Sequence, residues 1–341
     1  QIYFDGYEEI IKKDYQKALS FFHKAAEQSN PDALFTLGFI YHKGLVDEEN
    51  GINIEKNDKK AYEWYLKAAE QEHPQAQYNI GFMYYSGETA FEEQGDDEES
   101  ASEGHGMIKE QDYKKAYEWY LKAATNNNMK AKCAIGSMYH RGQGMKEKDY
   151  IKAREWYAQG AQQGHDECQF ALGLMFYNGE GIDKNYYRAQ KWFMKAAFEH
   201  EHTQSQYYLG LLLSLGKGGI QQNQKKAQEW FMKAAKQGNH PESQNALGSQ
   251  YYNGEEGIKQ DFTKAEEWFR KAAQQGNANA QFSLSIIYHD IKKDYKNSML
   301  WCEKAANQGY VEAQHNMGTS YQDGSEEEEG CKGGGGRGGG G

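Results

Sequence analysis

The sequence has no run of apolar residues that approaches the roughly twenty needed for a membrane-spanning helix, so we expect no membrane insertion. Basic residues are also a minority, since 39 lysines and arginines stand against 50 acidic residues and leave a net charge of −11. Much of that excess lies in two segments: residues 88–110 hold nine acidic residues and Lys109, and residues 325–341 begin with a run of glutamates. The rest is nearly neutral, which excludes the basic surface expected of a protein that binds nucleic acid.

Signatures of catalytic and cofactor sites are missing as well. The glycine-rich stretch LGKGGIQ at 215–221 lacks the GK[ST] arrangement of a phosphate-binding loop. The only local histidine cluster is His200-Glu201-His202, which has no third ligand, so we interpret it as a solvated turn. Because no Ser/His/Asp or Cys/His set can be assembled from the sequence without the fold, we expect no catalytic residue, no cofactor and no metal.

A repeated block is what the sequence does contain. The eleven residues KKAYEWYLKAA occur twice, at 59–69 and 114–124, and six weaker copies follow the same pattern. The first alanine of each copy is followed by the next after 33 to 55 residues. These positions are Ala18, Ala61, Ala116, Ala153, Ala189, Ala227 and Ala265, with Ser298 in the last copy. A period of this length is typical of a solenoid built from one supersecondary unit.

Each unit is predicted to be a pair of helices. In the first helix, apolar residues recur at i, i+3, i+4, i+7 and i+8, as in Ala61, Trp64 and Tyr65. A second block repeats the helical spacing around Gly81 and Tyr84 and ends in a glycine that suits a helix stop. Short polar links join the two, so we expect antiparallel neighbours.

The AxxWyxKAA block, the LGxxYxxG block and their spacing resemble the Sel1-like repeat (SLR) family, close relatives of tetratricopeptide repeats. The resemblance covers residues 14–324 and implies an all-α fold, a right-handed α/α superhelix. It also implies a scaffold or adaptor role, with first helices that line a concave groove.

The repeats set the expected domain organisation. We predict a solenoid over 1–324, with repeats that begin near residues 14, 57, 111, 148, 185, 223, 261 and 294. Residues 1–13 match the end of a preceding repeat, so we expect a fragment, a processed chain or an incompletely read sequence. Residues 88–110 form an acidic loop insertion and residues 325–341 an acidic, glycine-rich tail.

Three sets of residues in the repeats bear on function. All seven tryptophans occupy one repeat position, as Trp119 does, and we interpret them as core. The glycine column around Gly136 is explained by close helix packing rather than by phosphate binding.

A ridge on the first helices carries apolar residues where polar ones are expected, and Met and Tyr suit peptide binding. This predicted ridge consists of Tyr62, Leu66, Tyr117, Leu121, Met194 and Met232. Coverage of these side chains by neighbouring repeats is the alternative.

If the ridge residues dominate partner binding rather than form core, polar replacements of Tyr62, Leu66, Tyr117 and Leu121 should weaken partner binding and leave stability nearly unchanged, whereas replacing Trp119 should do the reverse. The expected function is therefore a non-catalytic scaffold that binds a protein or peptide in its groove. A self-assembling protein is the alternative, because neither end of the solenoid has a polar capping repeat and ends could associate head to tail. A hydrolase on an SLR scaffold is a remote third hypothesis.

Cysteine usage favours a cytoplasmic location. Cys133 and Cys168 lie at different positions of adjacent second helices, Cys302 lies on a first helix and Cys331 in the tail. The cysteine pair that staples each repeat in some secreted SLR proteins is missing, so we expect reduced thiols. No N-glycosylation sequon occurs. Secretion stays open because a signal peptide would lie upstream of residue 1.

Overall fold

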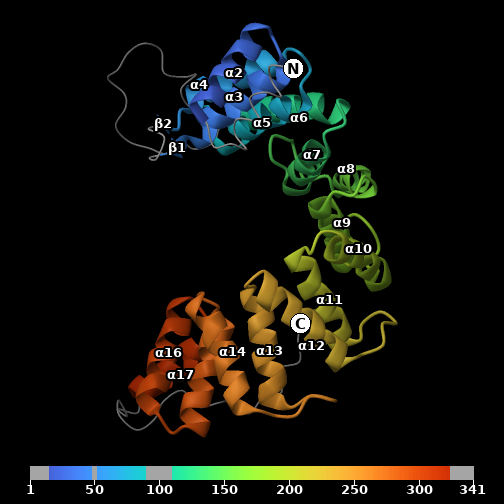
Figure 1. Cartoon of the computed structure of the whole chain (residues 1–341). Helices are drawn as coiled ribbons and strands as arrows, with labels where there is room; N and C mark the ends of the chain where they lie inside the picture. The colour runs from blue at the N-terminus through green and yellow to red at the C-terminus, as the bar shows by residue number, and fades with distance from the viewer. Residues whose placement is uncertain (1–14, 48–51, 90–109, 323–341) are drawn as a thin grey trace. The chain divides into compact units, whose positions relative to one another are not determined.

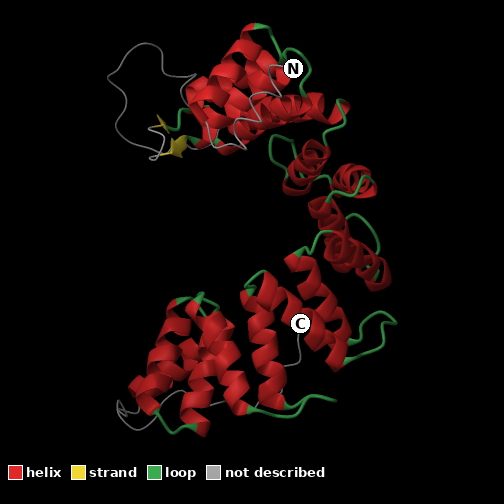
Figure 2. Ribbon diagram, in the orientation of Figure 1, coloured by secondary structure: helices red, strands yellow, loops and turns green. Residues whose placement is uncertain are grey.

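The computed structural model describes residues 15–47, 52–89 and 110–322. Within them the chain is an all-α repeat solenoid with one two-stranded sheet (Figures 1 and 2). It divides into two compact units, residues 1–175 with 180–183, and residues 176–179 with 184–341. The predicted remnant at 1–13, the interior of the acidic loop and the tail from 325 lie outside the described residues.

The first unit contains the helices α2 to α9. Their bounds are α2 (Tyr15–Glu27), α3 (Pro31–Lys43), α4 (Asp58–Ala69), α5 (Pro74–Ser86), α6 (Glu110–Thr125), α7 (Met129–Arg141), α8 (Tyr150–Gln162) and α9 (Asp166–Asn178). The link between α3 and α4 holds an antiparallel hairpin of β1 (Leu45–Asp47) and β2 (Ile52–Ile54), which the sequence patterns did not predict.

The second unit follows the same plan. Its helices are α10 (Tyr186–Glu199), α11 (Thr203–Leu215), α12 (Gln224–Gln237), α13 (Pro241–Asn253), α14 (Phe262–Gln274), α15 (Ala278–Ile286), α16 (Tyr295–Asn307) and α17 (Val311–Gln322). A π-helical turn, η3 (Ile287–Ile291), continues α15. None of the described helices combines the length and apolar content that a membrane crossing requires.

Even-numbered helices carry the KAA block and odd-numbered helices the glycine block. A second helix packs more extensively against the first helix of the following repeat than against its own partner, as α5 does against α6. The core therefore lies between repeats as much as within them, which is the property that makes a solenoid nearly one-dimensional.

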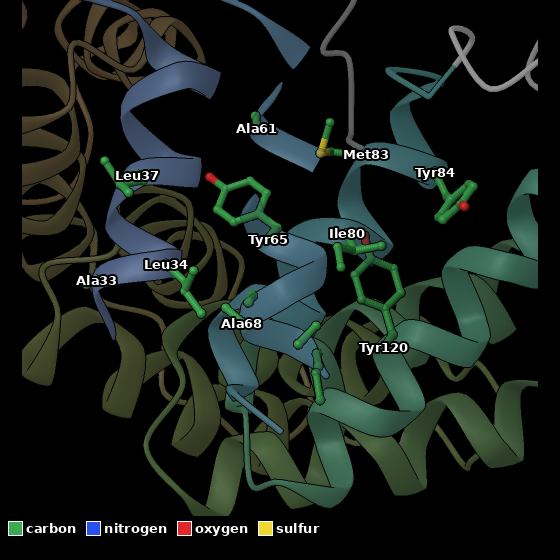
Figure 3. Close-up of a cluster of buried hydrophobic side chains, with 14 of the residues drawn as sticks. Ala33, Leu34, Leu37, Ala61, Tyr65, Ala68, Ile80, Met83, Tyr84 and Tyr120 are labelled. Carbon is green, nitrogen blue, oxygen red and sulfur yellow. The ribbon is translucent and has the colours of Figure 1, made fainter. Parts of the chain in front are cut away.

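The main core side chain is the aromatic residue that follows six of the seven tryptophans, whereas Trp301 is followed by the buried Cys302. Tyr65 lies against the helix that carries Leu34 and Leu37, and Tyr120 lies beside Ile80 (Figure 3). The ring enters the space left by the glycine of the preceding second helix: a Cβ on Gly38 would lie 2.5 Å from Cδ1 of Tyr65. The glycine column thus makes room for a ring, not only for a close approach of two helix backbones.

Asparagine, aspartate or histidine begins most of the helices. The side chain accepts a hydrogen bond from a backbone N–H of the first turn, which satisfies a donor that has no partner within the helix. Asn128 does so for α7 through Oδ1. His73 and His240 do so for α5 and α13 through Nδ1, at 3.1 and 3.2 Å. A histidine can accept in this way only while Nδ1 is unprotonated.

Lowering the pH from about 7.5 to about 5.5 is therefore expected to destabilise the chain through His73 and His240. Burial lowers the pKa of each ring and outweighs the carboxylates of Asp32, 3.3 Å from His73, and Glu242, 3.4 Å from His240. As the pH falls below about 6.5, the unfolded chain binds protons before the folded chain does, so the free energy of unfolding is full above that pH and decreases below it.

The variant His73→Asn/His240→Asn tests this expectation, because the chain itself uses asparagine at the same position in α3, α7 and α15. We expect urea unfolding to show unchanged stability near pH 7.5 and a weaker decline toward pH 5.5. The matched variant with alanine at both positions should lose about 1 kcal/mol per cap at the higher pH. A decline as steep as in the parent chain would contradict the role of the two rings.

Candidate protein-binding surface

The tyrosines of the predicted ridge pair with tyrosines of their own repeat. The hydroxyl groups of Tyr62 and Tyr84 lie 2.9 Å apart, and those of Tyr117 and Tyr139 lie 3.1 Å apart. Each pair of rings meets edge to face, with centroids at about 6 Å. Burial and the hydrogen bond to Tyr139 raise the pKa of Tyr117 to about 12. Both ridge tyrosines are half-buried and pack against the core, so they contribute to the repeat as well as to its surface.

The aliphatic residues of the ridge are more accessible. Leu121 on α6 is 38% exposed, whereas Leu66 on α4 is half-buried against the core of the first unit. In the second unit, Met194 on α10 is 40% exposed and Met232 on α12 is half-buried. Tyr62, Leu66, Tyr117 and Leu121 thus belong to the first unit, and the two methionines to the second.

The tryptophans do not form the core, contrary to the sequence-based interpretation. Each is half-buried, and the fully buried position is the next residue along the chain. For six of the seven, a lysine three residues later covers the indole face, with Nζ 3.9 to 4.7 Å from the nearest ring centroid, whereas Trp156 has Gln159 at that position. These pairs are Trp64–Lys67, Trp119–Lys122, Trp192–Lys195, Trp230–Lys233, Trp268–Lys271 and Trp301–Lys304. A cation over an exposed indole contributes about 0.5–1 kcal/mol.

Two open pockets of the first unit are built around these pairs. One, of about 430 Å³, lies between α4 and α6 and is lined by Trp119, Lys122 and Thr125 with Ala69 and Glu70 opposite. The other, of about 420 Å³, lies between α2 and α4. It is lined by Ala26, Glu27, Ser29, Leu34, Trp64, Lys67, Glu70 and Gln71. The repeat thus places the same indole and lysine at the wall of both pockets.

The rim of the α4–α6 pocket is polar and organised. The Asn126 side chain donates to the Gln77 carbonyl at 3.0 Å and to the Glu72 backbone carbonyl at 3.2 Å. Glu70 and Glu72 add carboxylates opposite Lys122. An apolar wall with a few fixed polar groups is the usual construction of a binding pocket. The sequence signal for it is the lysine three residues after six of the seven tryptophans, which the interpretation of the tryptophans as core left unused.

The frequent histidines have structural partners. His42 and His140, near the ends of second helices, pair with Glu88 and Glu180 of the following repeat at 3.1 and 2.8 Å. His202 is 7% exposed and begins α11 by accepting from the Ser205 N–H, so it does not belong to a solvated turn as expected.

The cysteines differ from expectation in two ways. Cys302 is disulfide-bonded, so the prediction of a reduced thiol is wrong for this residue. Cys133 and Cys168 are free, as expected, but they lie together beside His165. The hydrogen bond from Cys168 lowers the pKa of the Cys133 thiol to about 7, and the same bond raises the pKa of Cys168. Cys133 is therefore the thiol that loses its proton first.

Helix pairs stacked in register define an α-helical repeat solenoid. The Sel1 repeat family model matches residues 1–30, 31–73, 74–101, 101–128, 130–165, 166–197, 203–239, 241–277, 278–310 and 311–330. The chain therefore belongs to the Sel1 repeat family. Sel1 repeat proteins are generally protein-interaction scaffolds that bind proteins, and their fold is typically non-catalytic.

Two solved structures are similar along most of the chain. One is c5321, a protective antigen present in uropathogenic Escherichia coli strains that displays an SLR fold. It is 30% identical with a TM-score of 0.72, over 95% of this chain and 64% of that one, so the present chain spans about two thirds of its length. The other, a Sel1 repeat protein from Oxalobacter formigenes, is 30% identical with a TM-score of 0.65, over 80% and 99% of the two chains. No curated protein matches.

Proposed function

We propose that the chain is a non-catalytic scaffold that binds a protein partner on the first-helix surface of α2, α4 and α6. The pockets beside Trp64 and Trp119 serve as anchor sites. The observation that carries this proposal is the construction of two pockets from the same repeated elements, an indole covered by a lysine and faced by glutamate. A linear segment of a partner can occupy both.

The predicted ridge continues from these pockets. Leu66 lies one helical turn before Glu70, and Leu121 one turn before Thr125, and both of the later residues line the α4–α6 pocket. Residues four apart lie on one face of a helix, so the ridge leucines share the face that leads to the pocket. Tryptophan is the residue type most enriched among side chains that dominate binding energy. Met194 on α10 and Met232 on α12 occupy the same repeat position as Leu66 and Leu121, so the second unit has a ridge of its own.

The charges favour a particular kind of partner. Glu27, Glu70 and Glu72 outnumber Lys67 and Lys122 around the two pockets, and both lysines lie over indole rings. A segment with an apolar or aromatic side chain for the pocket and a basic residue beside it is therefore the best match, because a basic group finds an unengaged carboxylate at the rim.

Filling the α4–α6 pocket tests the proposal. Thr125 is exposed at the pocket wall, so Thr125→Arg blocks the space without removing a core contact. We expect the partner that is captured by the parent chain, once identified by mass spectrometry and purified, to bind this variant at least about tenfold more weakly, a loss of about 1.4 kcal/mol. Calorimetric titration of the purified pair measures this.

The control is Gln274→Arg, which makes the same change at the equivalent exposed position of α14 in the second unit. It should leave the affinity unchanged. Equal affinity for the parent chain and Thr125→Arg would contradict the pocket as an anchor, and capture of only further copies of the chain would favour the self-assembly alternative.

A further inference from the structure

A cluster of two thiols and one imidazole lies at a junction between repeats of the first unit. Cys133 comes from α7, Cys168 from α9, and His165 from the link that begins α9. One ligand atom of each lies within 4.8 Å of those of the other two. A tetrahedral zinc ion with Zn–S distances of about 2.3 Å and Zn–N distances of about 2.0–2.1 Å holds such atoms roughly 3.5–4 Å apart, so the three donors lie near the separations that zinc needs.

Comparison with the other repeats shows how Cys133 comes to face His165. The equivalent positions of α3 and α11 are Phe35 and Tyr207, which pack on the histidine that begins the next second helix. The ring centroids of Phe35 and His73 are 4.8 Å apart, and those of Tyr207 and His240 are 5.1 Å apart. In α7 the corresponding residue is Cys133, so a thiol replaces the aromatic ring that α3 and α11 have there. The imidazole of His165 therefore lies beside a sulfur atom instead of a ring.

A second substitution makes room for the other thiol. Cys168 is fully buried at a position where the other second helices have alanine or serine. The residue opposite it is Gly160, and a Cβ there would lie 2.3 Å from Sγ of Cys168. The other first helices have alanine at this position: Ala25, Ala68, Ala123, Ala196, Ala234, Ala272 and Ala305. The glycine is therefore required by the sulfur atom.

The surroundings suit a cation. In the metal-free chain the backbone N–H of Cys168 donates to Nδ1 of His165 at 3.4 Å, and this long hydrogen bond is exchanged for the metal bond when the ring binds an ion, because a neutral imidazole has one free lone pair. Asp166 and Glu167 form the acidic first turn of α9, and a carboxylate oxygen of Asp166 lies 3.9 Å from Nδ1 of His165. A set of two sulfur donors and one nitrogen donor binds zinc in preference to calcium or magnesium, which take oxygen ligands.

We propose that Cys133, His165 and Cys168 bind a thiophilic divalent cation, with Zn²⁺ as the best-fitting ion and the fourth position left to water or an added ligand. This site is separate from the pockets beside Trp64 and Trp119. The site has no signature in the sequence, because the two cysteines occupy different repeat positions and no spacing motif joins them.

Cobalt serves as the optical probe. The chain is reduced, freed of metal and titrated with Co²⁺, and we expect thiolate-to-cobalt charge-transfer absorption together with visible bands of tetrahedral intensity, at one ion per chain. Added Zn²⁺ should displace the cobalt. Zn²⁺ should also raise the midpoint of thermal unfolding, because an ion that binds only the folded chain stabilises it.

The chain offers conservative variants for each ligand, since each replacement occurs at the same position of another repeat. These are Cys133→Phe, as in Phe35, Cys168→Ser, as in Ser205, and His165→Asn, as in Asn128. Each should lower the cobalt affinity at least tenfold while circular dichroism stays that of the parent chain. His240→Asn, the same change in the second unit, should leave the titration unchanged.

Two results would overturn the proposal. One is the absence of charge-transfer absorption in the reduced parent chain, or absorption that persists in Cys133→Phe, which would assign the cobalt to other thiols. The other is that the two thiols bind neither Co²⁺ nor Zn²⁺ but form a Cys133–Cys168 disulfide when oxidised glutathione is added. The cluster would then be a redox pair.

Discussion

Replacing Tyr120 with alanine is expected to lower the free energy of unfolding by about 3–5 kcal/mol, as large-to-small changes in a core do. The ring is 2% exposed, fits against Gly81 and lies 5.5 Å from the ring of Tyr78. The adjacent Trp119→Ala should cost clearly less. Its indole is half-buried at the wall of a pocket and is covered on one face by the flexible side chain of Lys122.

Urea unfolding of the two variants measures the difference. Tyr120→Phe is the control, because the chain uses phenylalanine at the same position in Phe231 and Phe269, so loss of the hydroxyl should be tolerated. If Trp119→Ala lowered the free energy of unfolding as much as Tyr120→Ala, the tryptophans would have to be counted as core residues. Their proposed role as anchors for a partner would then lose its main support.

This contrast marks a limit of prediction from the sequence. The pattern of the KAA block predicts the first helix and its apolar stripe, because buried positions recur every three or four residues. Trp119 and Tyr120 both fall within that stripe, and a single helix does not decide which of them is buried. The decision comes from the preceding repeat, where Gly81 leaves room for one ring only.

The candidate sites were less predictable than the fold for the same reason. The pairing of Tyr117 with Tyr139, the pocket between α4 and α6 and the cluster at Cys133 all join residues from different helices. Periodicity places each residue on a helix face but does not give the offset between one helix and the next. That offset follows from packing, and it decided that His165 lies beside Cys133 and Cys168.

The second large effect is expected at the glycine column. Gly248→Ala should destabilise the chain by about 1–3 kcal/mol, the usual cost of overpacking a core. The new Cβ would lie 2.5 Å from Cδ1 of Phe269 and 2.7 Å from Cε1, closer than carbon atoms approach. Since alanine is otherwise favoured over glycine in a helix by about 1 kcal/mol, a net loss of stability identifies the clash with the ring as the cause.

The chain contains its own control for this substitution. In α15 the glycine position is occupied by Ser285, and the position of α16 that corresponds to Phe269 is Cys302, whose side chain is much smaller than a ring. Ser285→Ala should therefore have little effect beyond the loss of the 2.7 Å hydrogen bond from its hydroxyl to the Phe282 carbonyl.

A double-mutant cycle decides the mechanism. In a Phe269→Cys background, Gly248→Ala should no longer destabilise the chain and should stabilise it slightly, because the ring is gone and the higher helix propensity of alanine remains. Chemical denaturation of the four proteins measures this coupling, and an unchanged cost of Gly248→Ala in the Phe269→Cys background would show that the glycine is needed for backbone packing instead.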